Sequence, residues 1–401
     1  MRWRSGIFIF ILIGLGLAGI SAFSQTLNPP SREVPNTYFG IHNFRFHDVK
    51  MRPTIDFGTW RLWDTGTNWA ELQPQKSIWN FTRLDLAVSI ANARGMEPVL
   101  TLGMTPSWAS MRPNESSFYG PGKASPPTSV AEYENYVETV ARKYSNRIRI
   151  FETWNEPASG AMFSGSIEQM VAITAAANKA VKRVSASNML VCPSPAKTES
   201  LAWFANFVRL GGAKHCDVIG YHFYEDRVQP ETRLELVQKV QTILATYGLK
   251  HMPIWDTESG FSTSRRPETG EASNNAHLAR WMILTWVAGV ERFYWYSWDH
   301  TPLGFVSLSG LRNERLIDAY KIVQRWMLGS RFKECSRSAQ LWHCNLTLKD
   351  GKAASIFWTD DNSNQIWKIV APARVEDLNG FSGEFTSTEL PVNGDPILII
   401  W

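Results

Sequence analysis

The sequence predicts a (β/α)8 TIM barrel followed by a small antiparallel β-sandwich domain. Short apolar runs alternate with helical patterns over residues 35–329, which indicates a parallel sheet covered by helices. After Gly329 the pattern changes to short alternating runs separated by DG, DDNSN, NG and NGD, so residues 330–401 are expected to form the sandwich. A doubly wound open sheet is the competing architecture. If it bound a nucleotide, it would normally need a glycine-rich turn after its first strand, and HNFRFHD stands there instead.

Each barrel strand is expected at one of the apolar runs. The segments between them place apolar residues on one helical face, as Leu84, Ala87, Val88 and Ala91 do before a stop at Gly95. Eight such units fit the barrel. The expected strands are Tyr38–Arg45, Thr59–Asp64, Pro98–Gly103, Ile148–Trp154, Met189–Ser194, Asp217–Tyr224, Pro253–Glu258 and Phe293–Trp298.

Composition excludes several classes of function. The 401 residues carry a formal net charge of only +4 with no clustered basic stripe, so we expect no nucleic-acid partner. The four cysteines have no CxxC-type spacing, and we expect neither a metal nor a cofactor. Cys335 and Cys344 fit neighbouring positions on a hairpin. Cys192 and Cys216 are expected at opposite ends of adjacent parallel strands, and therefore unpaired and buried.

The N-terminus has the pattern of a secretory signal peptide over residues 1–24. Arg2 and Arg4 precede the apolar run Ile7–Ile20, and Ala22–Ser24 fits a cleavage site. The alternative is an uncleaved membrane anchor, but the run is shorter than the roughly 20 residues that a span needs. We therefore expect a secreted or periplasmic protein that makes no membrane contact after cleavage.

Two carboxylates stand at strand ends. Glu156 follows the fourth expected strand and Glu258 ends the seventh. In a barrel of this type the C-terminal strand ends carry the chemistry. Two carboxylates about 5–5.5 Å apart hydrolyse a glycosidic bond with retention of configuration.

Five motifs carry a resemblance to a known family: RLWDTGTNWAELQP, TLGMTPSWAS, FETWNEP, WDTESGF and FYWYSWD. The chain resembles the clan A retaining glycoside hydrolases, most closely glycoside hydrolase family 39 and its relatives. The resemblance implies that Glu156 is the general acid/base and Glu258 the nucleophile. It also implies that Asn155 contacts the sugar 2-hydroxyl. Members of the clan need no metal or nucleotide.

The resemblance extends to substrate-binding residues. Arg61 and Tyr224 match groups that hydrogen-bond the nucleophile, and Arg61 is expected to keep it charged while Glu156 holds the proton. His222 and Trp298 match residues of the subsite beside the scissile bond, with Trp298 as a floor under a sugar ring. Trp295 is the alternative to Trp298.

Two further residues complete the expected set. His42, on the first strand, is as easily a core residue as a binding residue, and Trp108 is either a cleft wall or core. Trp108 also marks a departure from the family, because several members of the clan have a histidine near the end of strand three. Glu152 is expected to be structural. The long loop at residues 111–129 would border the active face, and it shapes an open groove or closes one end into a pocket.

These features predict a secreted, monomeric retaining glycoside hydrolase that cleaves internal β-glycosidic bonds of a polysaccharide. The first alternative is an exo-acting β-xylosidase or β-glucosidase. The second is a non-catalytic barrel that binds polysaccharide, although such a barrel would normally have lost one glutamate. A cell-surface adhesion protein acting through the β-domain is a third alternative, which the intact strand-end residues disfavour.

Overall fold

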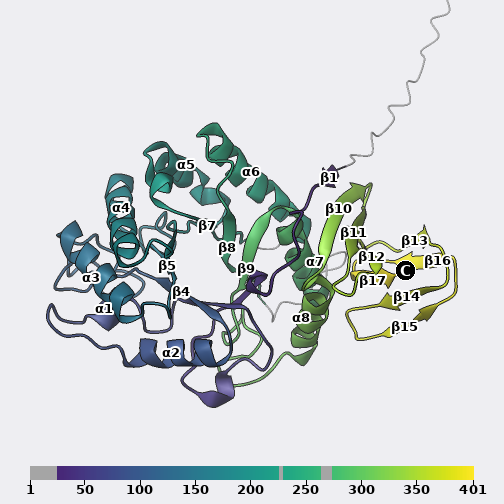
Figure 1. Cartoon of the computed structure of the whole chain (residues 1–401), viewed down its shortest axis with the longest axis horizontal. Helices are drawn as coiled ribbons and strands as arrows, with labels where there is room; N and C mark the ends of the chain where they lie inside the picture. The colour runs from purple at the N-terminus through teal and green to yellow at the C-terminus, as the bar shows by residue number, and fades with distance from the viewer. Residues whose placement is uncertain (1–24, 225–228, 263–272) are drawn as a thin grey trace, which may run out of the picture.

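The computed structural model describes residues 25–224, 229–262 and 273–401. Eight parallel strands form the central sheet in the order β6-β5-β4-β3-β2-β9-β8-β7 (Figure 1). This arrangement confirms the predicted barrel. The strands are β2 (Phe39–Ile41), β3 (Thr59–Leu62), β4 (Glu97–Thr101), β5 (Ile150–Glu152), β6 (Met189–Val191), β7 (Ile219–Tyr221), β8 (Ile254–Ser259) and β9 (Val290–Trp295).

The barrel closes between β6 and β7 through residues just outside the two strands. Val191 forms a parallel bridge with Val218, and the Cys192 amide donates to the Val218 carbonyl at 2.8 Å. Ala196 bridges His222 further along. The end of β6 is therefore level with the start of β7, which is the stagger that closing a barrel requires.

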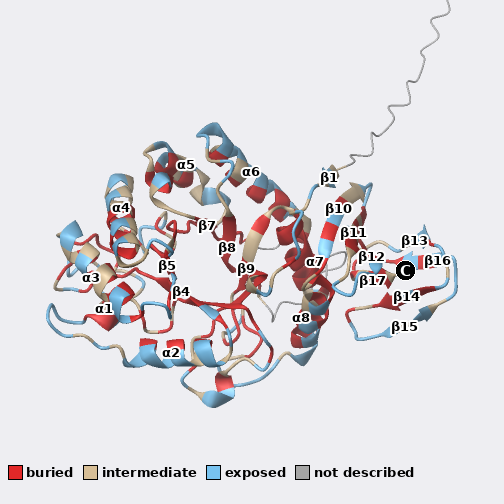
Figure 2. Cartoon of the chain, viewed as in Figure 1, coloured by how far each residue is buried: buried red, intermediate tan, exposed pale blue. Residues whose placement is uncertain are grey.

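Helices surround the barrel, and most of them show both buried and exposed surface in Figure 2. Side-chain caps fix several of their starts. The Ser129 hydroxyl accepts from the Glu132 amide, and Ser166 and Gln169 form a capping box. The helices are α1 (Trp69–Leu72), α2 (Thr82–Ala93), α3 (Val130–Lys143), α4 (Ile167–Val184), α5 (Leu201–Arg209), α6 (Arg233–Thr246), α7 (Asn274–Val287) and α8 (Glu314–Met327).

Helix α7 differs from the others because it is buried on all sides. Every residue from Ala276 to Val287 is buried. The C-terminal domain covers the face of α7 that would otherwise meet solvent, and Arg280 of α7 donates from Nε to the Gly394 carbonyl at 2.8 Å. The C-terminal domain is thus packed firmly against the barrel.

The C-terminal domain consists of two antiparallel sheets. A seven-stranded sheet has the order β1-β10-β11-β12-β17-β14-β15, and β13 pairs with β16. Strand β1 comes from the start of the described chain, so this sheet also takes in residues before the barrel. The strands are β1 (Gln25–Leu27), β10 (Arg331–Ser338), β11 (Leu341–Thr347), β12 (Ala353–Thr359), β13 (Gln365–Lys368), β14 (Ala373–Glu376), β15 (Ser382–Phe385), β16 (Glu389–Val392) and β17 (Ile397–Ile400).

Both cysteine pairs form disulfides. Cys335 and Cys344 face each other on the β10–β11 hairpin, as expected. The prediction that Cys192 and Cys216 are unpaired was wrong, because they are bonded with their Cα atoms 5.3 Å apart. The barrel stagger explains the error: β6 ends level with the residues that precede β7, so the two cysteines lie side by side.

The expected signal peptide, residues 1–24, lies outside the described residues. Among the residues that the structure describes, no helix has the length and apolar content needed to cross a membrane.

Candidate active site

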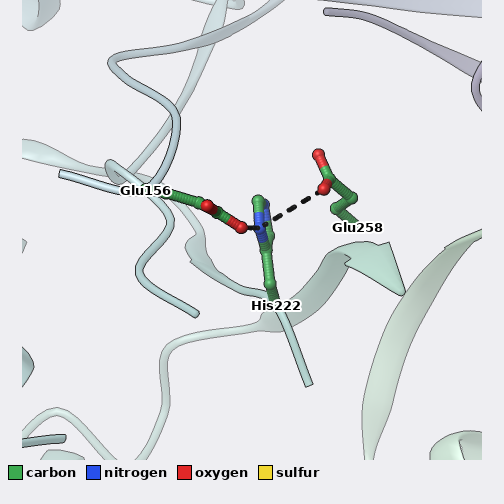
Figure 3. Close-up of side chains that lie close together, drawn as sticks. All are labelled: Glu156, His222 and Glu258. Atoms are coloured by element: carbon green, nitrogen blue, oxygen red, sulfur yellow. Dashed lines mark hydrogen bonds and ion pairs between the residues drawn. The ribbon is translucent and has the colours of Figure 1, made fainter. Parts of the chain in front are cut away.

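Polar side chains from four barrel strands meet at the C-terminal face of the barrel. Glu258 belongs to β8, Glu156 follows β5, His222 follows β7, and Arg61 lies in β3. Figure 3 shows Glu156 and Glu258 reaching toward the His222 ring from opposite sides. In barrel enzymes this face carries the catalytic groups.

Glu258 is held at both carboxylate oxygens. Nη1 of Arg61 donates to its Oε2 at 2.8 Å, and the Tyr224 hydroxyl donates to its Oε1 at 3.0 Å. Only 7% of the residue is exposed. The two donors fix the orientation of the carboxylate, as the sequence predicted for Arg61 and Tyr224.

Arg61 is fully buried and connects three strand ends. Its Nε donates to Oε2 of Glu152 at 2.6 Å, and its Nη2 donates to Oδ1 of Asn155 at 2.9 Å. The hydroxyls of Thr101 and Ser194 also donate to Glu152. Glu152 is therefore the inner anchor of Arg61, and the guanidinium presents its remaining charge to Glu258.

Glu156 occupies an unusual backbone conformation. Its φ is +44°, in the left-handed region, which costs a non-glycine residue about 1–3 kcal/mol. The surrounding chain holds it there, because its amide donates to the Ser194 carbonyl at 2.9 Å and its carbonyl accepts from the Ser159 amide at 3.0 Å. Its side chain is 23% exposed, and Nδ1 of His222 lies 3.0 Å from its Oε1.

The two carboxylates are close enough for a retaining mechanism. One ligand atom from each of Glu156, His222 and Glu258 lies within 4.8 Å of the others. Retaining glycosidases have their carboxyl groups about 5–5.5 Å apart, against roughly 6.5–9.5 Å in inverting ones. The same three groups could contact a divalent cation, but Arg61 is already 2.8 Å from Glu258 and would repel it.

The pKa values of Glu156 and Glu258 do not follow the expected order. Burial raises the pKa of Glu258 to about 7, although the charges of His222 and Arg61 act against it. Burial also acts to raise the pKa of Glu156, but the hydrogen bond and charge of His222 outweigh it and lower this pKa. Arg61 does favour the charged form of Glu258, as expected, but burial has the larger effect on this pKa. Without a substrate, the pKa is therefore raised at Glu258 and lowered at Glu156, which is opposite to the order that the two roles require.

The remaining predicted binding residues lie in different surroundings. Trp298 and Trp295 are fully buried; Trp298 packs against Phe305, so neither ring offers a floor to a sugar. His42 is also fully buried, with Nε2 3.0 Å from the Thr257 carbonyl, and its ring packs edge-on against Tyr296. Trp108 is partly exposed, and its Nε1 donates to the Gln73 carbonyl at 2.9 Å.

One further carboxylate and two tyrosines near Glu258 were not predicted from the sequence. Asp64 follows β3, and its Oδ1 and Oδ2 accept from the hydroxyls of Tyr119 at 2.8 Å and Tyr296 at 3.0 Å. Tyr296, not a neighbouring tryptophan, is the aromatic residue that reaches the site from the end of β9. The position of Asp64 at the end of a strand was the available signal for it. Nothing in the sequence marks Tyr119, which belongs to the loop between β4 and α3.

A family comparison agrees with this geometry. The family model of the glycosyl hydrolases family 39 matches residues 50–288, which is more than half of the chain. The chain belongs to glycosyl hydrolases family 39. The family 39 chain is thus a retaining glycoside hydrolase that acts on O-glycosyl bonds.

Solved structures share the fold of this family 39 chain at low identity. A family 39 glycoside hydrolase from the gut symbiont Bacteroides cellulosilyticus WH2 is 16% identical, with a TM-score of 0.74 over 93% of this chain and 82% of that one. A monomeric β-xylosidase from Caulobacter crescentus CB15 is 15% identical, with a TM-score of 0.67 over 93% and 97%. A family 39 enzyme from Xanthomonas axonopodis pv. citri is 14% identical, with a TM-score of 0.65 over 93% and 95%. Among curated protein sequences there is no match.

Proposed function

We propose that the family 39 chain hydrolyses β-glycosides by double displacement, with Glu258 as the nucleophile and Glu156 as the general acid/base. The observation that supports this proposal most is that the two neighbouring carboxylates differ in their contacts and in their exposure. Arg61 and Tyr224 hold both oxygens of Glu258, while Glu156 is more exposed and contacts His222. A nucleophile needs a fixed orientation, and an acid/base needs access to a leaving group and later to water.

The reaction follows in two steps. An oxygen of Glu258 attacks the anomeric carbon, the bond to the leaving oxygen breaks, and Glu156 gives that oxygen its proton. Glu156, now ionised, takes a proton from water, whose oxygen attacks the anomeric carbon. The ester bond to Glu258 breaks, and both carboxyl groups return to their starting states.

Substrate binding has to raise the pKa of Glu156 above that of Glu258, so that Glu156 holds the proton when the glycosidic bond breaks. A glycosidic oxygen against Glu156 accepts a hydrogen bond only from the protonated carboxyl, which favours the neutral form there. The bound sugar also covers the 23% of the Glu156 side chain that is exposed, and so raises its pKa by desolvation. At Glu258, positive charge that develops on the sugar ring in the transition state stabilises the ionised carboxylate.

Two other residues take part in this proposal. The amide oxygen of Asn155 accepts from Arg61, so its NH2 group is the donor that we propose for the sugar 2-hydroxyl. His222 contacts Glu156 and lies 4.0 Å from Glu258, where it limits the movement of the acid/base.

We propose a β-linked oligosaccharide or polysaccharide as the substrate and a monomer as the working form. The sequence favoured cleavage of internal bonds, whereas the fold shared with a monomeric β-xylosidase supports the exo-acting alternative. The two disulfides support export to the periplasm or the outside of the cell, because such bonds persist in oxidising compartments.

The test is hydrolysis of a panel of aryl β-glycosides and polysaccharides by the wild type, Glu258→Gln and Glu156→Ala. Glu258→Gln is expected to lose nearly all turnover. Glu156→Ala should lose less kcat/KM where the leaving group is good, because that group needs little protonation. Hydrolysis of the covalent intermediate should then limit its turnover, and azide should relieve this step and give a β-glycosyl azide. Glu199→Gln removes an exposed carboxylate after β6 and serves as the control.

A glycosyl azide of inverted configuration from Glu156→Ala would mean that Glu156 is the nucleophile and Glu258 the acid/base. A folded wild type that binds a glycan but hydrolyses no member of the panel would favour the non-catalytic barrel.

A further inference from the structure

The cluster of Asp64, Tyr119 and Tyr296 joins three separate segments beside the nucleophile. Asp64 follows β3 and has a φ of +55°, in the left-handed region. Each of its oxygens accepts from a different tyrosine hydroxyl. A side chain that joins two strand ends to a long loop fixes the shape of this side of the site.

The loop that carries Tyr119 is held by its own contacts. Nε of Arg112 donates to Oε1 of Glu115 at 3.0 Å, and Nη2 of Arg112 donates to the Ser164 carbonyl at 3.0 Å. The Tyr119 ring packs edge-on against Trp63, with centroids 5.5 Å apart. Tyr119 is therefore placed by a built structure, and it stays beside the barrel without help from a substrate.

The cluster lies on the nucleophile's side of the site. After burial, which has the largest effect, the charges of Glu156 and Asp64 add to the raised pKa of Glu258. The charges that act most on Glu156 come instead from His222, Arg61 and Lys197. His222 and Lys197 follow β7 and β6, whereas Asp64 and Tyr296 follow β3 and β9, which flank β2. This placement favours a substrate orientation in which the leaving group lies on the Glu156 side and the sugar attacked by Glu258 extends toward Asp64.

The chemistry of the cluster suits sugar hydroxyls. A carboxylate offers about four lone-pair positions, and the two tyrosines use one on each oxygen of Asp64. The two remaining positions can accept from neighbouring hydroxyls on one sugar ring. Tyr296 is partly exposed and adds an aromatic surface next to them.

We propose that Asp64 binds two adjacent hydroxyls of the non-reducing terminal sugar, and that Tyr119 blocks further sugars on that side. The inference rests on the proposed function, and it makes the enzyme exo-acting. The three residues are binding residues of the subsite that holds the attacked sugar.

The first test measures kcat/KM on the aryl β-glycoside that the wild type hydrolyses best. Asp64→Asn is expected to lower it about 10- to 100-fold, because a hydrogen bond to a charged group is lost. Tyr119→Phe removes one hydroxyl and should lower it less. In each variant the loss of kcat/KM should be the same for good and for poor leaving groups, whereas in Glu156→Ala it should depend on the leaving group. The controls are Asp318→Asn, at an exposed position of α8, and Tyr247→Phe, at the C-terminal end of α6. Thermal unfolding checks that each variant is folded.

A second test uses the 4-deoxy and 3-deoxy forms of the same aryl glycoside. If Asp64 binds one of these hydroxyls, its removal should cost the wild type about tenfold or more and cost Asp64→Asn little. Tyr119→Ala should release oligosaccharides from a polysaccharide that the wild type shortens one sugar at a time.

Two results would overturn the inference while leaving the proposed function intact. One is that the wild type is active, but removal of a sugar hydroxyl lowers kcat/KM by the same factor in the wild type and in Asp64→Asn. The other is release of oligosaccharides by the wild type from the start of digestion. A wild type with no hydrolytic activity would instead overturn the proposed function.

Discussion

Arg61 and Arg280 are both buried beside carboxylates, and the two sites differ in what those carboxylates contact. At the barrel mouth, Arg61 bonds Glu152 at 2.6 Å and Glu258 at 2.8 Å, and Glu258 faces the site. Between the barrel and the C-terminal domain, Arg280 is 3.7 Å from Glu231, whose Oε1 also accepts from an indole.

The Arg280 cluster ends in structural contacts. Nε of Arg280 donates to the Gly394 carbonyl at 2.8 Å, and Nε1 of Trp358 donates to Glu231 at 2.8 Å. These groups join two domains, while those around Arg61 orient a carboxylate for attack. A buried ion pair of this kind thus becomes functional only where one of its members reaches a site open to substrate.

The largest effect that separates the two regions is expected from Glu152→Gln. Without its inner anchor, Arg61 shifts, and misplacement of this kind costs on the order of 10²-fold in kcat. Breaking a buried pair should also lower the free energy of unfolding by about 3–5 kcal/mol. The freed charge of Arg61 acts more on Glu258, so the pH at which activity falls should decrease. Kinetics over a range of pH measure the loss of kcat and the shift in pH dependence, and denaturant unfolding measures the free energy of unfolding.

Glu231→Gln is the matched control for Glu152→Gln, since it neutralises a buried carboxylate beside the other arginine. It should leave kcat unchanged. An equal loss of kcat in both variants would mean that Glu152 acts only through stability.

A smaller effect is expected from Arg280→Gln. Loss of its bonds to the C-terminal domain should lower the free energy of unfolding by about 1–3 kcal/mol. The value of kcat should stay within about twofold, because no group of the site contacts Arg280 and distant sites are independent. A large drop in kcat at a temperature where the variant is folded would show that the domain interface controls the active face.

The last prediction concerns the dependence of kcat/KM on pH. The Glu156–Glu258 pair holds one proton between the lowered pKa of Glu156, below its ordinary value of 4.5, and the pKa of about 7 at Glu258. As pH rises above about 7 the pair loses that proton and the general acid is missing, so kcat/KM should fall about tenfold per pH unit. Below pH 4.5 a second proton removes the nucleophile. A kcat/KM that is constant up to pH 9 would contradict this assignment.

The sequence was sufficient for the barrel and for the residues at its strand ends. Parallel strands bring their C-terminal ends to one face, so Glu156, Glu258, Arg61, Tyr224 and His222 could be expected together. Their hydrogen bonds follow from that arrangement.

Other features depend on information that a sequence does not carry. The Cys192–Cys216 bond depends on the stagger between two strands, and the choice of Tyr296 over Trp298 depends on how the chain bends after β9. The raised pKa of Glu258 depends on how deeply its side chain is buried. The contact of Tyr119 with the site depends on the path of a long loop.

The central claim is that Glu258 forms the covalent bond with the sugar. It is tested most directly by incubating the wild type with the 2-deoxy-2-fluoro form of a glycoside that it hydrolyses, followed by peptide mass spectrometry. We expect a mass increase of one fluoroglycosyl unit on the peptide that contains Glu258, with turnover lost in proportion. A label on Glu156, or no label together with a hydrolysis product of inverted configuration, would contradict it.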